Sequence, residues 1–417
     1  MREIKRNFYL NKLISRKNSD FIKIITGIRR CGKSYLLFDL YYNYLLDNGV
    51  DNEHIILINL ENDEYEYLYD RTKLREYIKS KIVDKKQYYL FVDEIQHVKN
   101  FEPMLNGLNQ IKNLDIYVTG SNSKFLSSDI ITEFRGRTEE IRVFPLSFSE
   151  FSSAYDGKNN DTLTEYLLYG GMPYTLSFNN NEEKSNYLKN LFKETFLKDI
   201  IDRHNIQKND ILESLVNILS SSVGSLTNPK KIVDTFISKG IKEVTNKTVD
   251  NYISYLLDSF IINKAERYDI KGRKYISTPS KYYFNDLGLR NARLNFRQYE
   301  ESHLMENAVY NELSIRGYSI DVGVVEIFKK DKNGKTVRST CEIDFVCNKG
   351  YKRYYIQSAL SMDDEDKKKI EIRPYLNIDD NFTKIVVTKN SPVYRNEQGI
   401  LIIGLKEFLL NPNSLDL

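Results

Sequence analysis

The chain has 417 residues, enough for two to four domains with cores of their own, and its mixture of apolar and charged residues is that of a globular protein. The formal net charge is only +3, so the overall charge does not indicate a nucleic-acid partner, and three cysteines without paired spacing suggest neither a disulfide framework nor a zinc site. No apolar run reaches the roughly 18 residues of a membrane span and no secretion signal is recognisable, so we expect a cytoplasmic protein with no membrane partner.

Residues 1–20 predict a leading helix, and the strongest motif of the chain follows it. Gly27-x4-Gly32-Lys33-Ser34 is the full phosphate-binding loop pattern, with an apolar β-branched run before it and apolar residues at helical spacing after it. A loop between a strand and a helix N-terminus presents backbone N–H groups and the helix dipole to a polyphosphate, while Lys33 adds positive charge and Ser34 a hydroxyl for Mg²⁺. The expected nucleotide-binding residues of the loop are Gly27, Ile28, Arg29, Arg30, Cys31, Gly32, Lys33, Ser34 and Tyr35.

A second nucleotide signature is the apolar run 88–92, a predicted strand that leads directly into Asp93 and Glu94. An acid at the end of such a strand can hold Mg²⁺, often through water, and a neighbouring carboxylate can polarise the attacking water. We assign Asp93 to the metal ion and Glu94 to the catalytic base. Capping and solvation explain most adjacent acidic pairs, but the complete phosphate-binding loop upstream favours the functional interpretation.

The next predicted strand, residues 115–119, ends in small hydroxyl and amide residues. Such residues could place a polar side chain beside the γ-phosphate of a nucleotide. Ser121 or Asn122 could be that sensor, and a helix cap from Ser123 onward explains the segment equally well.

Two arginines, Arg135 and Arg137, precede a predicted final strand over residues 140–144. An arginine at this position could serve in cis, or could reach the nucleotide of a neighbouring subunit in a homo-oligomer as an arginine finger. Arg137 is our candidate, and a solvated surface pair is the alternative. The expected catalytic residues are therefore Lys33, Glu94 and Arg137.

The predicted strands and helices up to residue 146 form a doubly wound α/β domain. The motifs GIRRCGKS, YYLFVDEIQHV, IYVTGSNS and FRGRTEEIRVFPLSFSEF, with YGGMP downstream, together resemble the AAA-type ATPases of bacteria and archaea, neighbours of the STAND ATPases, that carry an uncharacterised C-terminal domain of restriction-endonuclease-like fold. The resemblance spans nearly the whole chain. It implies an AAA+-like P-loop core that binds ATP.

Residues 147–208 have apolar residues at helical spacing and predict a small helical bundle, which we interpret as a lid over the nucleotide. The stretch YGGMP, residues 169–173, breaks a helix in three ways and must be a tight turn with a structural role. Arg203 could sense the nucleotide from the lid, although an i,i+4 pair with Asp199 explains it more simply.

Residues 209–285 predict three helices and a hairpin, the order of a winged helix. Residues 245–255 would be the recognition helix, and the basic residues of the hairpin the wing. The helix also carries Asp250, and a DNA-binding helix is usually more basic. DNA or protein could therefore bind here, and the sequence favours protein. The wing residues are Lys271, Arg273 and Lys274.

Residues 286–417 predict an α/β domain that contains the order of acids found in restriction-type nucleases. Glu306 on a helix, Asp344 on a strand and Gln357 on the next strand match that order. The lysine expected two residues after Gln357 is missing, because Ala359 stands there. Lys352, Arg353 or a displaced lysine could substitute, but the sequence favours an inactive nuclease-like scaffold.

The sequence thus predicts four parts: a P-loop ATPase core at 1–146, a helical lid at 147–208, a winged-helix domain at 209–285 and a nuclease-like domain at 286–417. The expected function is Mg²⁺-dependent binding and hydrolysis of ATP that drives or gates conformational change of the C-terminal domains. The alternatives are a nucleotide-gated switch that binds DNA or protein with little turnover, and a DNA-cleaving effector.

Overall fold

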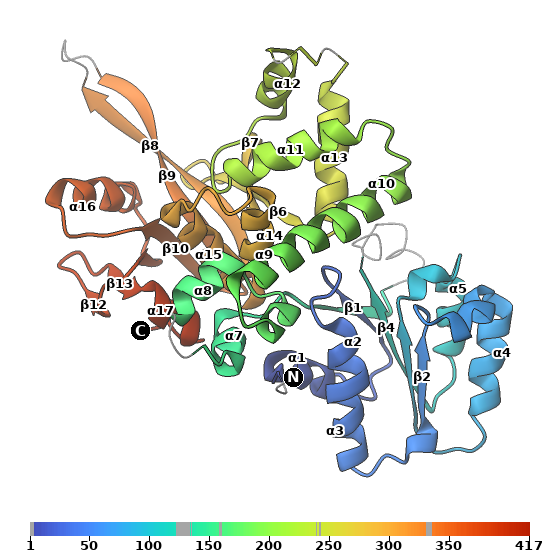
Figure 1. Cartoon of the computed structure of the whole chain (residues 1–417). Coiled ribbons are helices and arrows are strands. Elements are labelled where there is room, and N and C mark those ends of the chain that lie inside the picture. Colours follow the sequence, from blue (N-terminus) through green and yellow to red (C-terminus); the bar gives the residue numbers. More distant parts are fainter. Residues whose placement is uncertain are drawn as a thin grey trace. The chain divides into compact units, whose positions relative to one another are not determined.

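The computed structural model describes residues 4–121, 134, 136–157, 161–238, 240–241, 243–330 and 336–417. Asn122, Ser123 and Arg135 lie outside these ranges. The chain forms two compact units, Met1–Pro145 with Asp258–Phe260, and Leu146–Leu257 with Ile261–Leu417 (Figure 1).

The first unit is built on a five-stranded sheet in which every pair of neighbouring strands is parallel. The strand order is β2-β3-β4-β1-β5, so β4 lies between β1, which leads into the phosphate-binding loop, and β3, which ends in Asp93. Because both faces of a parallel sheet are covered, its central strands read as continuous apolar runs. The strands are β1 (Ile22–Thr26), β2 (Ile55–Asn59), β3 (Tyr88–Asp93), β4 (Leu114–Gly120) and β5 (Thr138–Arg142).

Helices cover both faces of this sheet. On one face Tyr41 packs its ring on Phe91 and Tyr117. On the other, Leu74 and Leu105 pack in one apolar cluster with strand residues of alternate positions. The predicted doubly wound α/β core is confirmed. Its helices are α1 (Asn7–Ser15), α2 (Lys33–Tyr35), a π-helical turn (Leu36–Tyr41), α3 (Tyr42–Asp47), α4 (Arg71–Lys81) and α5 (Glu102–Leu108).

The second unit begins with a series of helices, and the glycine turn of YGGMP is bound to one of the last of them. Gly170 has φ 71°, and a Cβ there would lie 2.3 Å from Oδ1 of Asp286. Asp286 accepts hydrogen bonds from the backbone N–H of Gly171 at 2.7 Å and of Leu289 at 2.9 Å. The helices are α7 (Phe148–Ala154), α8 (Thr162–Tyr169), α9 (Asn181–Asn190), a π-helical stretch (Leu191–Leu197), α10 (Lys198–His204), α11 (Asn209–Ser221), α12 (Pro229–Ser238), α13 (Asn246–Asp258) and α14 (Leu287–Arg293).

A second contact joins the same segments. Asn291 of α14 donates to the carbonyl oxygens of Leu167 and Leu168 at 3.0 and 2.9 Å. The turn therefore has the structural role that the sequence predicted. These bonds also cross the boundaries expected at residues 208 and 285, and the division of residues 147–417 into three domains stays a prediction.

The helices α11, α12 and α13 are followed by a hairpin of β6 (Ile262–Asp269) and β7 (Lys274–Phe284). Thr227, between α11 and α12, forms an antiparallel bridge with Ser280 of β7. The hairpin does not project as a free wing, because β6 also pairs in parallel with β8 from Arg267↔Val322 to Asp269↔Val324. The hairpin and the C-terminal strands thus share one sheet.

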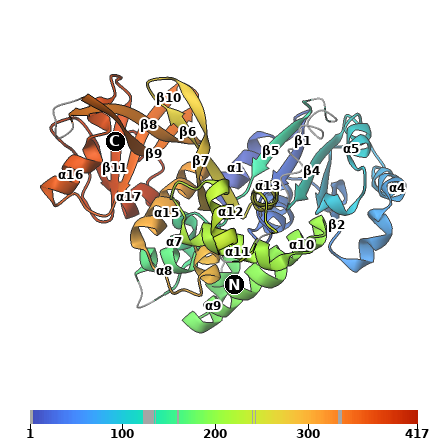
Figure 2. The ribbon, with the colours of Figure 1, turned by 90° about the horizontal axis from the view of Figure 1, so that it is seen from above.

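This mixed sheet has eight strands in the order β12-β13-β11-β10-β9-β8-β6-β7 (Figure 2). Tyr310 of α15 stacks on Tyr283 of β7 on one face, while Ile372 of α16 joins the apolar cluster of Tyr355 and Val386. The remaining elements are α15 (Glu301–Ile315), β8 (Ser319–Lys330), β9 (Thr336–Lys349), β10 (Lys352–Ala359), α16 (Glu365–Ile372), β11 (Thr383–Thr388), β12 (Tyr394–Arg395), β13 (Leu401–Gly404) and α17 (Leu405–Leu410).

Across the described ranges, no helix combines the length and the apolar character that crossing a membrane requires.

Candidate nucleotide site and a second acidic cluster

The phosphate-binding loop lies at the carboxyl end of β1 and depends on its two glycines. Gly27 has φ 146° and Gly32 φ 98°, both in the region that favours glycine. A Cβ on Gly27 would lie 2.1 Å from the carbonyl oxygen of Val143, so a larger residue would push the loop away from the strand end. Gly32 is followed directly by α2, so the loop presents its backbone at a helix N-terminus, as the sequence predicted.

Lys33 lies inside this loop rather than on its surface. Its side chain is buried, and its Nζ donates to the carbonyl oxygens of Gly27 at 3.1 Å and of Ile28 at 3.4 Å. Oε1 of Glu94 lies 3.8 Å from the same ammonium. The partners within hydrogen-bond distance are neutral carbonyls, which a phosphate can replace, and the Glu94 carboxylate is a more distant ion-pair partner.

Ser34 and Asp93 meet across the sheet edge, although 59 positions separate them. Oγ of Ser34 donates to Oδ2 of Asp93 at 2.7 Å, and the hydroxyl of Thr119 donates to the other carboxylate oxygen. Burial raises the pKa of Asp93, and the hydrogen bonds from Thr119 and Ser34 oppose that rise. A hydroxyl and a carboxylate at the mouth of a phosphate-binding loop are ligands that fit Mg²⁺.

Glu94 takes a left-handed backbone conformation, φ 51° and ψ 51°, immediately after β3. Its backbone N–H donates to Oγ1 of Thr119 at 2.9 Å, and its carboxylate accepts from the amide of Gln96. The same Gln96 amide lies 3.5 Å from Oγ of Ser121. The predicted base and the described sensor candidate are therefore connected through Gln96.

Thr119 and Gln96 form hydrogen bonds in this site that the sequence did not predict. Thr119 is the next-to-last residue of an apolar strand, so its hydroxyl was a signal in the sequence. Gln96 stands two residues after Glu94, where nothing in the pattern separates it from a surface residue.

The other residues of the phosphate-binding loop differ in their exposure to solvent and in their contacts. Arg29 forms an ion pair with Glu61 at 2.7 Å, and Arg30 is exposed with φ 63°. Cys31 is buried, with Sγ 3.4 Å from the carbonyl oxygen of Val143, and burial raises the pKa of its thiol. Ile28 is buried and Tyr35 is half-buried.

Arg6, just before α1, supports the loop from behind. Its side chain is fully buried, with Nη1 donating to the carbonyl oxygen of Cys31 at 2.7 Å and Nη2 to that of Phe144 at 2.8 Å. Arg6 therefore joins the loop to the chain that leaves β5. Sequence reasoning missed it, because an arginine near a helix start usually faces solvent.

Arg137 is exposed at the beginning of β5. The pairing Ile22↔Thr138 places it at the amino end of the parallel sheet, whereas the loop follows Thr26 at the carboxyl end. Five residues of strand, about 16 Å, separate the two ends. The expected role in cis is therefore wrong for the nucleotide of the same chain, and a role across a subunit boundary stays a prediction.

A second group of acidic side chains lies in the C-terminal sheet, where the nuclease-like order was predicted. Lys281 of β7 forms ion pairs with Glu306 at 2.9 Å, Glu342 at 2.8 Å and Asp344 at 3.1 Å. Burial lowers the pKa of Lys281, but the carboxylates of Asp344, Glu306 and Glu342 more than offset this, so its pKa lies above the ordinary value.

The other residues of the predicted nuclease pattern have separate contacts. The backbone N–H of Asp344 donates to Oε1 of Gln357 at 3.3 Å, and Ala359 is buried. Lys352 pairs with Asp416, and Arg353 donates to Asn348, so neither replaces the missing lysine. The lysine that contacts both acids is Lys281, and it comes from a strand that precedes them in the chain.

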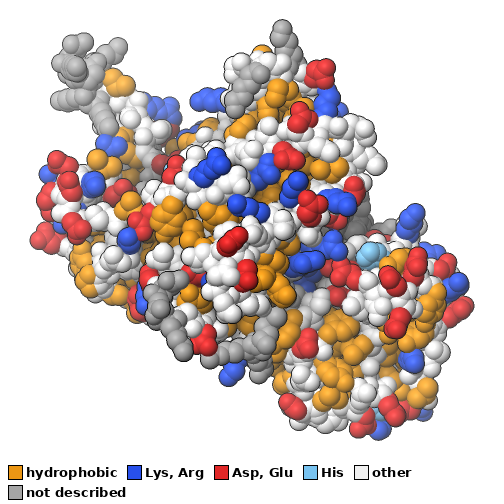
Figure 3. Space-filling view, viewed as in Figure 1, with side chains coloured by type: hydrophobic (Ala, Val, Ile, Leu, Met, Phe, Trp, Pro, Cys, Tyr) orange, Lys and Arg blue, Asp and Glu red, His pale blue; other side chains and the backbone are white. Residues whose placement is uncertain are grey.

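The expected recognition helix corresponds to α13. Asn246, Lys247 and Asn251 are exposed, but so is Asp250, and Tyr252 is buried in the core. The hairpin residues Lys271, Arg273 and Lys274 are exposed. Over the face shown in Figure 3, acidic and basic side chains are interspersed.

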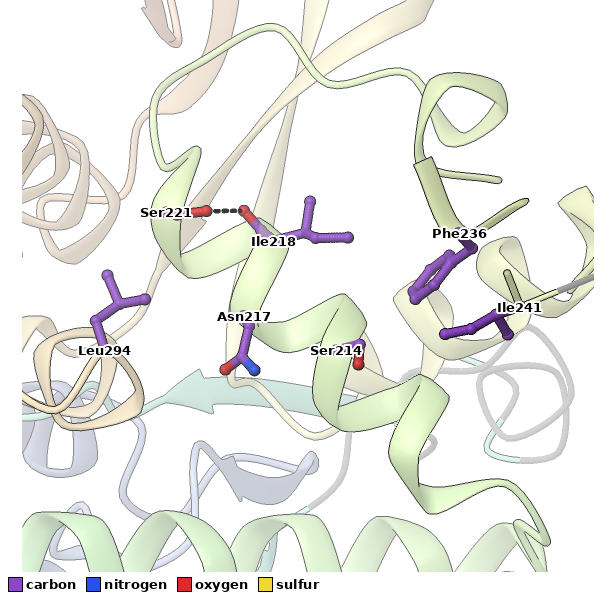
Figure 4. Close-up of a pocket in the computed structure, with 7 residues that line it drawn as sticks. All are labelled: Ser214, Asn217, Ile218, Ser221, Phe236, Ile241 and Leu294. Carbon is purple, nitrogen blue, oxygen red and sulfur yellow. Dashed lines mark hydrogen bonds between the residues drawn. The ribbon is translucent and has the colours of Figure 1, made fainter. Parts of the chain in front are cut away.

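A pocket of about 290 Å³ opens beside α11. Figure 4 shows side chains that reach it from α11, from α12 and from the residue after α14. Its lining is largely apolar with small polar groups, and it contains no titratable side chain. The lining residues are Ser214, Asn217, Ile218, Ser221, Phe236, Ile241 and Leu294.

Comparison with known proteins bears on both units. Residues 19–152 match the family described as AAA domain, and residues 160–300 match a domain of unknown function, DUF8612. An uncharacterized protein of Haemophilus influenzae is 34% identical over 413 residues, which cover 98% of each chain. The chain belongs to the same family as this protein. The match to the AAA domain confirms the predicted AAA-type core, and AAA ATPases generally bind ATP with Mg²⁺.

Two further similarities are weaker. The uncharacterized protein MJ1544 of Methanocaldococcus jannaschii is 29% identical over 378 residues, covering 87% of this chain and 79% of that protein. The structure of the Aeropyrum pernix ORC1 protein in complex with DNA aligns at 12% identity with a TM-score of 0.31, over 70% of this chain and 92% of that one.

The DUF8612 match crosses the boundary expected at residue 208.

Proposed function

We propose that the chain is a Mg²⁺-dependent ATPase whose nucleotide state drives or gates conformational change in the parts that follow residue 146. The observation that carries this proposal is the 2.7 Å contact between Oγ of Ser34 and Oδ2 of Asp93 at the mouth of the loop. The contact brings together the two side chains that would hold Mg²⁺. An accidental GKS sequence would not be met by an acid from another strand.

The loop residues from Gly27 to Tyr35 would bind the phosphates of ATP, with Lys33 moving from the loop carbonyls to the outer phosphates. Mg²⁺, when held by Ser34 and Asp93, supplies positive charge to the phosphate oxygens. Glu94 would accept the proton of the attacking water. Ser121 or Asn122 would contact the γ-phosphate.

The surroundings of Glu94 support its role as base. The bond from its backbone to Thr119 and the bond from Gln96 to its carboxylate fix the side chain at the end of β3. A base held in one orientation favours proton transfer from a water in line with the phosphate.

Two variants test this proposal in the full chain. Lys33→Ala should abolish ATP binding, and Glu94→Gln should bind ATP with unchanged affinity but hydrolyse it at least about a hundredfold more slowly. Binding is measured by isothermal titration calorimetry and turnover by phosphate release. Undiminished turnover of Glu94→Gln would remove the base assignment, and ATP binding by Lys33→Ala would remove the site.

A second candidate is a nucleotide-gated switch that turns over slowly and binds a partner through α13. The bridge between Thr227, which lies between α11 and α12, and Ser280 of the hairpin supports this candidate, because a winged helix is expected to combine three helices with a hairpin. The exposed Asp250 beside Lys247 favours a protein over DNA. A salt titration of DNA binding, with and without ATP, distinguishes a DNA partner from a protein partner, since the affinity of a DNA-binding protein for DNA falls steeply with salt.

A homo-oligomer in which Arg137 acts on a neighbouring subunit is part of the same proposal. Light scattering with and without ATP measures the assembly. If ATP promotes association, Arg137→Ala should assemble normally and hydrolyse slowly. A chain that stays monomeric with ATP would remove the role of Arg137.

A further inference from the structure

We propose that Lys281 takes the place of a divalent metal ion between Glu306 and Asp344, so that the C-terminal sheet holds a permanent internal cation and binds no metal there. The inference does not depend on the ATPase activity. It bears on DNA cleavage, the alternative function for which the sequence supplies two acids, because a DNA-cleaving site would need Mg²⁺ between Glu306 and Asp344.

The position of the ammonium is the first argument. Nζ of Lys281 lies within 3.1 Å of a carboxylate oxygen from each of Glu306, Glu342 and Asp344. The side chain of Lys281 is only 4% exposed, and that of Asp344 9%. A buried ammonium with three carboxylate partners fills the point at which the carboxylates converge.

The other hydrogen bonds of Glu306 and Asp344 are the second argument. The hydroxyl of Tyr283 donates to Oε1 of Glu306 at 2.7 Å, and the backbone N–H of Ser358 donates to Oδ2 of Asp344 at 2.9 Å. A Cβ on Gly224 would lie 3.0 Å from the carboxyl group of Glu306, so the turn after α11 packs directly against that side chain. A hydrated metal ion would have to displace several of these contacts together.

The local strand geometry explains why a lysine can reach this point. The register of β7 against β6 shifts between Ala265, which faces Lys281, and Arg267, which faces Ile276. The register of β9 against β8 also shifts, so that Asp344 lies in a bulge. Strand irregularities redirect side chains, and these two turn the lysine and the acid toward each other.

The geometry as found is not that of a metal site. Among the residues that the structure describes, no three His, Cys, Asp or Glu side chains are arranged to hold a metal ion. The three acids surround the ammonium instead of a common point open to solvent. Removing the ammonium should therefore create the site that the lysine now occupies.

The test is Mn²⁺ binding to the full chain without nucleotide, measured by the electron paramagnetic resonance signal of free Mn²⁺. Ser34→Ala is used as the parent chain, so that the nucleotide site does not contribute. We expect the parent and its Asp344→Asn variant to bind the same amount of Mn²⁺. Adding Lys281→Met should create one additional Mn²⁺ site per chain, which Asp344→Asn should abolish.

Lys281→Arg is the matched control, because it keeps the charge and should gain no Mn²⁺. A loss of bound Mn²⁺ on changing Asp344→Asn in the parent would overturn the proposal, because the acids would then hold a metal beside the lysine. A folded Lys281→Met chain that gains no Mn²⁺ would overturn it as well. If Lys281→Met does not fold, the parent and Asp344→Asn chains still decide the question.

Discussion

Each unit of the molecule contains a buried lysine close to carboxylates, and the two lysines differ in what holds them. Lys33 donates to two neutral carbonyl oxygens of its own loop and lies 3.8 Å from Glu94. Lys281 is held by three carboxylates, one from α15 and two from β9, each within 3.1 Å. An ammonium bound to carbonyls can move to an incoming anion, whereas one that balances buried charge cannot leave without exposing that charge to an apolar interior.

The largest expected difference between the two lysines is in stability. Lys281→Met should lower the free energy of unfolding by about 3–5 kcal/mol, because it leaves buried carboxylates without a cation. Lys33→Met should lower it less, by about 1–2 kcal/mol, because it removes hydrogen bonds to neutral carbonyls and one longer ion pair with Glu94. Urea unfolding followed by circular dichroism measures both. Equal losses in the two variants would contradict the distinction.

A further buried carboxylate, Asp286, sharpens the comparison because its described hydrogen bonds come from backbone N–H groups. Burial raises its pKa to about 6, although hydrogen bonds from Leu289, Gly171 and neighbouring N–H groups lower it. The folded chain therefore keeps a proton that the unfolded chain releases between about pH 4 and 6, so the contribution of Asp286 to stability is greatest below pH 4 and falls as the pH rises to 6.

Between pH 4 and pH 6 the free energy of unfolding should fall by up to about 3 kcal/mol. The reason is that the pKa of Asp286 is raised by about two units, and each unit corresponds to about 1.4 kcal/mol. Thermal unfolding at pH 4, 5 and 6 measures it, and Asp286→Asn should reduce this dependence. A dependence on pH that Asp286→Asn leaves unchanged would show that another group causes it.

Arg6 tests whether the loop of the first site needs support from behind. Arg6→Met should weaken ATP binding about tenfold, or by about 1.4 kcal/mol, because the carbonyl groups of Cys31 and Phe144 lose a common donor. The exposed neighbour Lys5 provides the control, and Lys5→Met should bind ATP normally. Isothermal titration calorimetry measures the ATP affinity of both variants. An unchanged affinity of Arg6→Met would show that the loop keeps its conformation without Arg6.

The smallest effect is expected at Gln96. Gln96→Ala should slow turnover by about fivefold to tenfold, roughly 1 kcal/mol, without changing ATP affinity, because it frees the Glu94 carboxylate to rotate. Gln110→Ala, at an exposed position of the same unit, should have no effect. A loss of affinity with turnover unchanged would place Gln96 in binding rather than in orienting the base.

The nucleotide site could be predicted from the sequence because each of its motifs is a short, contiguous pattern. The phosphate-binding loop and the acids after β3 follow apolar strands directly, and parallel strands bring their carboxyl ends to one edge. Arg137 shows the limit of local information. Its position before a strand was correct, but the parallel order places that end of β5 away from the loop.

The second unit could not be derived in this way. Lys281 lies beside an irregularity in the pairing of β7 with β6, and Asp344 lies in a bulge of β9. Such irregularities redirect side chains, and the hydrophobic pattern of the sequence does not indicate them. The contact of Gly170 with Asp286 joins positions more than a hundred residues apart. The pairing of β6 with β8 likewise depends on the whole sheet, and nothing in the hairpin sequence indicates it.

That pairing has a mechanical consequence. Moving the hairpin of β6 and β7 relative to α15 would require breaking the backbone hydrogen bonds between β6 and β8, together with the ion pairs of Lys281, and each loss is costly. The hairpin and the strands after it should therefore move as one rigid piece. Any movement driven by ATP would then have to bend the chain where it passes between the two units, near residues 145–146 and 257–261.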